Sequence, residues 1–245
     1  MWINKIKKFL NLVLPVNCLG CEKTGDLICP ECLKQIVIAG QYIPNSYHLD
    51  KAITVLDYHQ PLIKKAIKTF KYPPFNQKVL DYLIPFLIEF LRFSPETICY
   101  LKKNNFVLIP IPLTRKKLAS RGFNQSELIA REISSEFNLS LKPKILKKIK
   151  GTPSQTNLDF QQRKNNVKDI FRVRPVRNFY KFSLKNLFTE NSGCCGISNG
   201  VQAGCPANVV LVDDVLTTGA TLAEAAKVLR QAGVKKIWAI ALARD

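Results

Sequence analysis

The pattern of apolar and polar residues near the C-terminus predicts a buried strand, a loop and a helix. Residues 209–212 are apolar without alternation, and three of the four are valine, which is typical of a parallel strand covered on both faces. Asp213 and Asp214 follow, and we expect them to end this strand. After a turn rich in threonine, residues 222–229 repeat apolar side chains at helical spacing. Ligands of open α/β sheets bind beyond the carboxyl ends of such strands.

Further elements follow from the same patterns. An apolar run predicts a strand over 52–58, and another predicts a strand over 106–112 that is ended by prolines. Helical spacing predicts helices over 61–71 and from about 126 to 137. Residues 79–93 are apolar but interrupted by charged residues and a proline. We therefore expect a core helix there and no membrane span.

The helix expected over 61–71 has two different sides. Ile63, Ile67 and Phe70 recur at helical spacing and predict its buried side. Lysines occupy the other side, and we interpret them as a solvated face. These lysines are Lys64, Lys65, Lys68 and Lys71.

The turn after Asp214 has the composition of a phosphate-binding loop. A glycine lets successive N–H groups converge on one anion, and the start of a helix offers further unpaired N–H groups. Thr221 and Glu224 fit a capping box at that helix start. The alternatives are an ordinary strand-turn-helix and a Walker-type loop, although the Gly-Lys-Ser/Thr of a Walker A motif is absent. The residues of the predicted cradle are Thr217, Thr218, Gly219, Ala220 and Thr221.

A basic loop is predicted between strand 106–112 and helix 126–137. Cations that follow the carboxyl end of a parallel strand are well placed for a second anion, such as pyrophosphate. A solvated connection without a ligand is the alternative. The residues expected on this side of the site are Thr114, Arg115, Lys116, Lys117 and Arg121.

Two CxxC pairs near the N-terminus indicate a metal site. Four thiolates from two turns satisfy tetrahedral Zn2+ without an open position, so the site would be structural. Disulfides and an iron–sulfur cluster are the rival interpretations. The predicted zinc ligands are Cys18, Cys21, Cys29 and Cys32. Three later cysteines could form a second metal or redox cluster or have no specific role: Cys194, Cys195 and Cys205.

Composition and charge narrow the class of protein. The 245 residues are 47% hydrophobic and carry a formal net charge of +19, which favours a globular chain with a polyanionic partner. Charge alone does not choose among nucleic acid, anionic lipid and phosphorylated substrates. Residues 1–14 faintly resemble an export leader, but an amphipathic helix is the simpler interpretation. We therefore expect a cytoplasmic protein.

The run over 209–221 resembles the phosphoribosyl pyrophosphate (PRPP) signature of type I phosphoribosyltransferases. In that family the paired acids contact the ribose hydroxyls and the loop holds the 5-phosphate. Further segments resemble one branch, the ComF family of competence-associated, phosphoribosyltransferase-like proteins. These segments are 108–113, 121–125, 152–156, 163–171, 241–244 and the cysteine pairs. The resemblance implies an α/β fold of the type I phosphoribosyltransferase kind, with a parallel sheet flanked by helices and a small N-terminal zinc ribbon of four cysteines.

The same resemblance implies a site for PRPP or a related ribose phosphate with Mg2+, in which Asp213 and Asp214 are the catalytic residues. It also implies a role in natural transformation, with single-stranded DNA and other competence proteins as partners. A catalytically active phosphoribosyltransferase of nucleobase or nucleotide metabolism is the alternative, and the sequence does not name an acceptor base.

The resemblance also sets the expected organisation of the chain. An N-terminal helix and zinc ribbon would occupy 1–40, and a phosphoribosyltransferase-like domain would occupy 41–245. The segment 176–208 departs from the family pattern and is predicted to be a loop insertion.

Aromatic residues near basic ones could stack on the bases of single-stranded DNA, although core packing is the more ordinary role. They are Phe123, Phe160 and Phe171.

Overall fold

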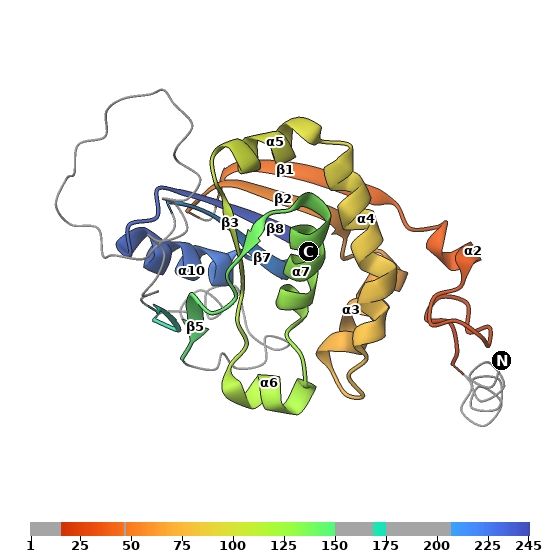
Figure 1. Ribbon diagram of the computed structural model, residues 1–245. Helices are drawn as coiled ribbons and strands as arrows, with labels where there is room; N and C mark the ends of the chain where they lie inside the picture. The colour runs from red at the N-terminus through yellow and green to blue at the C-terminus, as the bar shows by residue number, and fades with distance from the viewer. Residues whose placement is uncertain (1–15, 47, 150–168, 175–206) are drawn as a thin grey trace, which may run out of the picture.

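The computed structural model describes residues 16–46, 48–149, 169–174 and 207–245 (Figure 1). The predictions made for 1–14, for 152–156, for Phe160, for nearly all of 176–208 and for the three later cysteines lie outside these residues. The described helices and strands, in chain order, are α2 (Pro30–Leu33), β1 (Ile38–Ser46), β2 (Leu49–Asp57), α3 (Pro61–Lys71), η1 (Gln77–Val79), α4 (Leu80–Arg92), α5 (Pro95–Lys103), β3 (Val107–Pro110), α6 (Arg115–Arg121), α7 (Gln125–Phe137), β4 (Ser140–Leu141), β5 (Leu146–Lys148), β6 (Phe171–Val173), β7 (Asn208–Leu216), α10 (Ala220–Gln231) and β8 (Lys236–Arg244).

Six of these strands form one sheet in the order β1-β2-β8-β7-β3-β4. All neighbours in it are parallel except β1, which pairs antiparallel with β2. The remaining two strands, β5 and β6, form a separate antiparallel pair. The α/β fold expected from the sequence is therefore confirmed. Because β7 is central, the loops that follow its carboxyl end meet those that follow β3.

Helices cover both faces of the six-stranded sheet, which explains why β7 is apolar without alternation. Val210 and Val212 pack in one cluster with buried residues of α3, α4 and α7. Val209 and Leu211 pack on the other face with buried residues of α10 and of the β5–β6 pair. Figure 1 shows α10 on the opposite side of the sheet from α4 and α7. Both faces of β7 are thus removed from water.

Two predicted helices occupy the expected positions. Helix α3 has the predicted bounds, and its buried side contains Ile63, Ile67 and Phe70. The apolar stretch 79–93 folds as the last residue of η1 followed by α4, which contains Pro85. None of the helices among the described residues is both long and apolar enough to cross a membrane.

Two local predictions are wrong. The paired acids do not end the strand, because β7 continues to Leu216 alongside β8, with Asp213 opposite Ala241 and Val215 opposite Ala243. The basic segment after β3 is not a loop but contains the short helix α6. Its start is capped by the Thr114 side chain, which accepts a hydrogen bond from the Lys117 backbone N–H at 3.3 Å, and it ends at Gly122, whose φ of 83° suits glycine.

Candidate functional site

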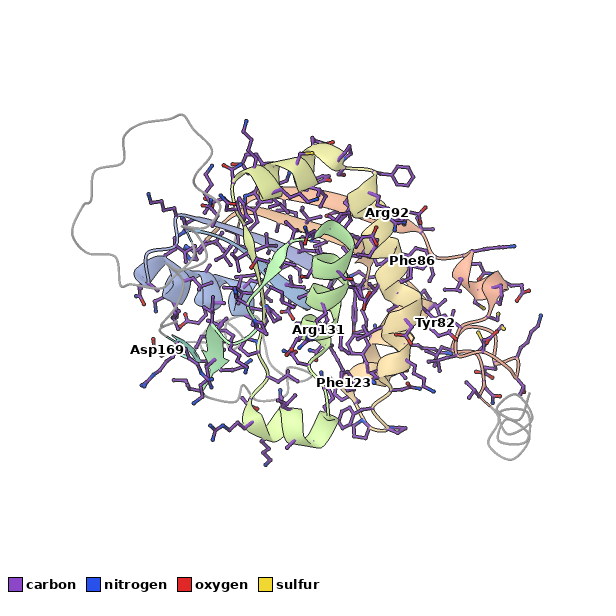
Figure 2. All side chains as sticks on the ribbon, in the orientation of Figure 1. Tyr82, Phe86, Arg92, Phe123, Arg131 and Asp169 are labelled. Atoms are coloured by element: carbon purple, nitrogen blue, oxygen red, sulfur yellow. The ribbon has the colours of Figure 1, made fainter. Side chains whose placement is uncertain are left out.

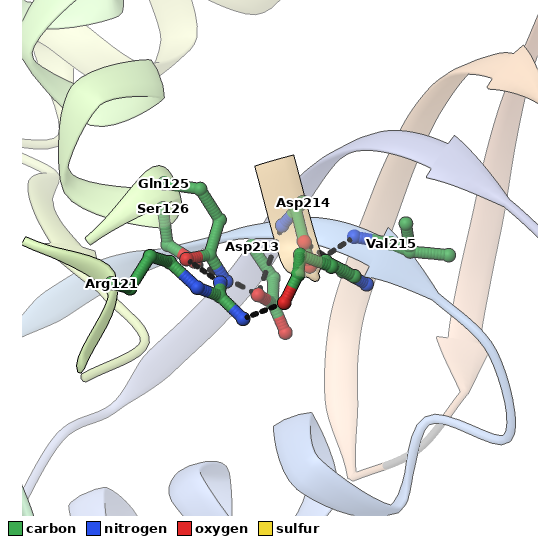
Figure 3. Close-up of polar contacts among 7 residues, drawn as sticks. Arg121, Gln125, Ser126, Asp213, Asp214 and Val215 are labelled. Carbon is green, nitrogen blue, oxygen red and sulfur yellow. Dashed lines mark hydrogen bonds and ion pairs between the residues drawn. The ribbon is translucent and has the colours of Figure 1, made fainter. Parts of the chain in front are cut away.

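Asp213 and Asp214 lie inside β7 near its carboxyl end, and both are buried, with 8% and 4% of their surface exposed. The Asp214 backbone N–H donates to Asp213 Oδ1 at 2.9 Å, and the Val215 N–H donates to Asp214 Oδ1 at 2.8 Å (Figure 3). The strand backbone therefore fixes one oxygen of each carboxylate. The other oxygens of the pair remain for side chains or a ligand.

Asp213 also receives a hydrogen bond from α7. The Ser126 hydroxyl is fully buried and donates to Asp213 Oδ1 at 2.9 Å. Burial, and next the neighbouring Asp214 charge, raise the pKa of Asp213 to about 7, although Lys71, the Asp214 N–H and Ser126 act in the opposite direction. This carboxyl consequently exchanges its proton near neutral pH.

Asp214 forms an ion pair with Lys71, the last residue of α3. Lys71 Nζ lies 3.0 Å from Asp214 Oδ2, and the exposed fractions of the two side chains are 28% and 5%. Burial disfavours the charged lysine, but the Asp214 carboxylate outweighs it and raises the pKa of Lys71. The prediction that Lys71 belongs to a solvated face is therefore wrong. Despite this ion pair, Asp214 Oδ2 accepts no well-aligned hydrogen bond from any described residue.

Arg121 ties the basic helix α6 to this ion pair. Its guanidinium donates to the Gln125 side chain at 2.6 Å and to the Lys71 backbone carbonyl at 2.9 Å (Figure 3). Burial lowers the pKa of Arg121, although the charge of Asp214 acts in the opposite direction. Nearby, the Asn124 side chain donates to the Ile111 carbonyl at 3.1 Å and so fastens the start of α7 to the end of β3.

The predicted phosphate loop follows β7 directly and leads into α10. Gly219 is the residue before the helix and has a φ of 70°, a left-handed conformation that suits glycine. The predicted capping box is wrong, because α10 begins at Ala220 and has no side-chain cap. Glu224 instead accepts a hydrogen bond from the Asp169 backbone N–H at 2.7 Å. The Ala220 N–H donates to the Thr218 hydroxyl at 3.5 Å, and the next N–H groups of α10 meet no side-chain acceptor among the described residues, as an anion site requires.

The cations of the predicted second anion site all lie on α6, which has no buried residue. Arg115 and Lys116 are exposed on α6 and have no carboxylate partner among the described residues. Lys117 is exposed as well, but partial burial and the charges of Arg121 and Lys71 lower its pKa. Sequence reasoning missed Lys148 on β5. Burial lowers the pKa of Lys148, and Lys117 acts in the same direction, although the Asp213 charge partly opposes them. The Asp213 charge therefore acts on Lys148.

The two described aromatic candidates belong to the core. Phe171 is 3% exposed, and Lys148 Nζ lies 5.5 Å from the centre of its ring. Phe123, between the end of α6 and the start of α7, packs half-buried against the core (Figure 2). The core interpretation is therefore favoured for both rings.

The four N-terminal cysteines come together in two short turns. Their sulfur atoms all lie within 4.8 Å of one another, close to the roughly 3.8 Å expected between thiolates around one Zn2+ at about 2.3 Å. Burial disfavours a Cys18 thiolate, but N–H donors of Cys21, Cys29 and Gly20 lower its pKa to about 6. Gly20 allows the turns to approach, because a Cβ there would lie 2.6 Å from Cys32 Sγ. These four residues could hold a metal ion.

A mostly parallel sheet with an acid pair near the carboxyl end of its central strand, followed by a threonine- and glycine-rich turn, defines a phosphoribosyltransferase-type fold. Residues 206–245, which contain the acid pair and the turn, match the phosphoribosyl transferase domain family. Competence protein F of Haemophilus influenzae is 28% identical over 233 residues, which cover 93% of this chain and 90% of that protein. The two similarities together support a member of the ComF family.

Two further relatives have the same extent of similarity. The DNA utilization protein YhgH of Escherichia coli K12 is 24% identical over 91% of this chain and 87% of its own length. Competence protein ComFC of Bacillus subtilis is 25% identical over 94% of this chain and 76% of its own length. The similarity therefore includes the cysteine turns and the sheet and is not confined to the phosphoribosyl transferase match.

Proposed function

We propose that this protein acts in DNA uptake during natural transformation, handles the incoming single strand, and binds PRPP or a related ribose phosphate with Mg2+. The relatives named for competence and DNA utilization support the role in DNA uptake. The phosphoribosyl transferase match supports the ribose phosphate. The observation that carries the ligand proposal is the buried acid pair near the carboxyl end of β7. Lys71 Nζ lies 3.0 Å from Asp214 Oδ2, and the remaining lone pairs of the two carboxylates could accept from a ribose hydroxyl or a metal-bound water.

Each part of the ligand has proposed partners in the chain. The 5-phosphate would lie in the cradle over 217–221, where the N–H groups at the start of α10 attract an anion. The ribose hydroxyls would donate to Asp213 and Asp214. The pyrophosphate would face Lys117 and the other residues of α6 that the sequence singled out. When bound, Mg2+ would neutralise phosphate charge and polarise the phosphate oxygens.

Transfer of the phosphoribosyl group to a nitrogen acceptor is a second candidate function. Lys117 and Lys148 favour it, because burial lowers the pKa of both lysines, and partly desolvated cations would stabilise the charge of departing pyrophosphate. Incubation with PRPP, Mg2+ and a panel of nucleobases would release pyrophosphate if the protein is active. PRPP binding without pyrophosphate release from any base would leave only the binding function.

The cysteine cluster is proposed to hold a structural Zn2+. Four sulfur ligands at this spacing match the preference of Zn2+ and leave no position for a substrate. Thiolate sites of this kind persist in reducing compartments, which supports a cytoplasmic location. The ribbon and the remaining chain, divided at about residue 40, are proposed as the two domains.

Isothermal titration calorimetry with PRPP and Mg2+ tests the ligand. The wild-type protein is expected to bind saturably, and the double variant Asp213→Ala/Asp214→Ala is expected to lose binding because no acceptor for the ribose hydroxyls remains. Asp81→Ala, an exposed residue of α4, is the matched control. Absence of binding by folded, zinc-loaded wild-type protein would contradict the proposal.

A further inference from the structure

We infer that single-stranded DNA binds where the parallel strands begin, on a surface of aromatic rings and lysines at the opposite end of the sheet from the acid pair. The inference rests on the proposed handling of single-stranded DNA and gives that ligand a site of its own. Figure 1 shows α5 at one end of β3 and α6 at the other. Lys236 opens β8, whereas Ala241, which pairs with Asp213, lies further along that strand. The stretch between them is roughly 17 Å long at about 3.3 Å per residue, so the two proposed sites are separate.

Aromatic rings and lysines alternate across this end of the sheet. The rings of Tyr100 and Trp238 are stacked, with centres 5.1 Å apart and planes inclined by 7°. Lys51 Nζ lies 4.7 Å from the centre of the Trp238 ring and 4.3 Å from that of the Tyr42 ring, so two rings hold it. Lys236 Nζ lies 5.3 Å from the centre of the Tyr100 ring and donates to its hydroxyl at 2.7 Å. We call these five residues the strand-start surface.

Two exposed aromatic side chains lie at one side of the strand-start surface. Phe93, the residue after α4, is 79% exposed, and Tyr42 is 41% exposed. The Tyr42 hydroxyl donates to the hydroxyl of Ser94, the residue after Phe93, so the two exposed rings lie in the same region. Phe93 contributes little to the core, because most of its side chain remains in water. Exposed flat rings beside cations are what the bases of a single strand stack on.

Further lysines gather at the other side of the strand-start surface, around the end of α5. Lys102 and Lys103 are exposed in the last turn of α5, and Lys235 is exposed just before β8. The Asn208 side chain donates to the Asn104 carbonyl at 2.6 Å, which holds the end of α5 against the start of β7. Because β7 and β8 pair from their first residues, the lysines of α5 and β8 lie on one edge of the molecule.

The positive charge of this edge is not neutralised by acids. Asp50, near the start of β2, pairs with Arg230 at 2.9 Å and accepts from the Ile237 N–H at 2.6 Å. Glu96 lies at the other end of α5 from the lysines. A polyanion would therefore meet cations without acidic partners beside exposed rings, the combination that binds single-stranded nucleic acid. The lysines that form no ion pair with a carboxylate in the described part of the chain are Lys51, Lys102, Lys103, Lys235 and Lys236.

The test measures binding of a fluorescein-labelled oligothymidylate by the full-length protein, with fluorescence anisotropy at several salt concentrations. The variant Lys102→Gln/Lys103→Gln/Lys235→Gln removes three exposed cations from this edge. It is expected to bind roughly tenfold more weakly at about 0.15 M salt, because contacts to the phosphates are lost. The slope of the logarithm of affinity against the logarithm of salt concentration should become shallower by about 2, since each contact to a single strand contributes about 0.7.

A matched control removes the same charge from another surface. The variant Lys64→Gln/Lys65→Gln/Lys68→Gln changes three exposed lysines of α3 and should bind the oligonucleotide like the wild type. An equal or larger loss of affinity in this control would overturn the inference, because net charge alone or the surface of α3 would then account for binding.

Phe93 tests base stacking separately from charge. Phe93→Leu keeps an apolar side chain but lacks a flat ring, so affinity should fall about fivefold or more while the salt slope stays unchanged. Phe93→Trp keeps a flat ring and should bind like the wild type. Both variants are expected to fold, since position 93 is 79% exposed. Equal affinity of wild type and Phe93→Leu would contradict the inference, because the exposed ring would then take no part in binding.

Comparison with the wild type separates this inference from the proposed function. If the wild type binds the oligonucleotide and the variants of this edge bind it equally well, only the proposed surface fails. If the wild type binds no oligonucleotide, the handling of single-stranded DNA fails, and the surface fails with it. All these variants should keep the PRPP affinity of the wild type in calorimetry, because their substitutions lie at the other end of the sheet from the acid pair.

Discussion

Ser126 on α7 donates a hydrogen bond to Asp213 on β7 at 2.9 Å, across 87 residues of sequence. The hydroxyl is buried, and the strand backbone supplies the other hydrogen bond to the same carboxylate oxygen. This contact connects the helix that follows the basic segment with the central strand of the sheet. It also stabilises the ionised form of an acid that burial drives toward the neutral form.

Replacement of this serine is predicted to cost stability. Ser126→Ala removes a buried donor and should lower the free energy of unfolding by about 1 kcal/mol, measured by urea denaturation. The pKa of Asp213 should rise further, because one group that favours the carboxylate is gone. Ser120→Ala, at an exposed position of α6, is the control and should leave the unfolding curve unchanged. Equal stability of wild type and Ser126→Ala would contradict the buried contact.

The stability of the protein is predicted to fall as pH rises from about 4 to about 7. The unfolded chain releases the Asp213 proton near the ordinary value of 3.8, whereas the folded chain holds it up to a pKa of about 7. Between these values the folded state binds more protons, so raising the pH lowers the free energy of unfolding, with no further loss above them. Urea denaturation across this range measures the effect.

Asp213→Asn identifies the group responsible for that pH dependence. The amide does not titrate, so this variant should lose the slope between about pH 4 and 7 that the wild type shows. Asp81→Asn removes an exposed carboxylate of α4 and should keep the slope. An identical pH profile for wild type and Asp213→Asn would exclude Asp213 as its source.

The close approach at Gly20 predicts how the cysteine turns respond to a single methyl group. In Gly20→Ala the new Cβ would lie 2.6 Å from Cys32 Sγ, so that sulfur must move from its place in the cluster. Metal content measured by atomic absorption should fall, and hydrogen exchange should quicken over 18–36. Lys34→Ala, just after α2, should retain its metal. Full metal content in Gly20→Ala would show that the turns adapt without cost.

Binding of single-stranded DNA is predicted to weaken steeply with salt. A chain with a formal net charge of +19 releases counter-ions from the DNA backbone, so the logarithm of the binding constant should fall linearly with the logarithm of salt concentration. The double variant Asp213→Ala/Asp214→Ala should retain DNA binding, because the buried acids do not reach a phosphate backbone. Fluorescence anisotropy measures both. Loss of DNA binding in a folded double variant would place both ligands on one surface.

The parts of the fold that could be predicted are those set by local pattern. Helix α3 has its predicted bounds because three apolar residues and the proline at its start define it. The strand β7 was predicted too short, because carboxylates are poor strand formers, and pairing with β8 overrides that preference.

The parts of the site that could not be predicted depend on tertiary contacts. Helical spacing alone assigned Lys71 to solvent, but it is the final residue of α3 and meets Asp214 only after the sheet has formed. Lys148 gave no sequence signal, since it reaches the site from the separate β5–β6 pair. Ser126 was assigned only to a helix start, and its bond to Asp213 requires α7 to pack on β7.

The hydrogen bond from Asp169 to Glu224 fastens the strand pair that carries Lys148 to the first turns of α10, beside which Asp169 lies (Figure 2). This hydrogen bond and the apolar contacts of Phe171 thereby join the phosphate cradle and the strand that carries Lys148 in one packed unit. Helix α6 has no buried residue. Hydrogen bonds from Arg121 to Gln125 and to the Lys71 carbonyl join α6 to α7 and α3, so polar contacts and not core packing hold this side of the site.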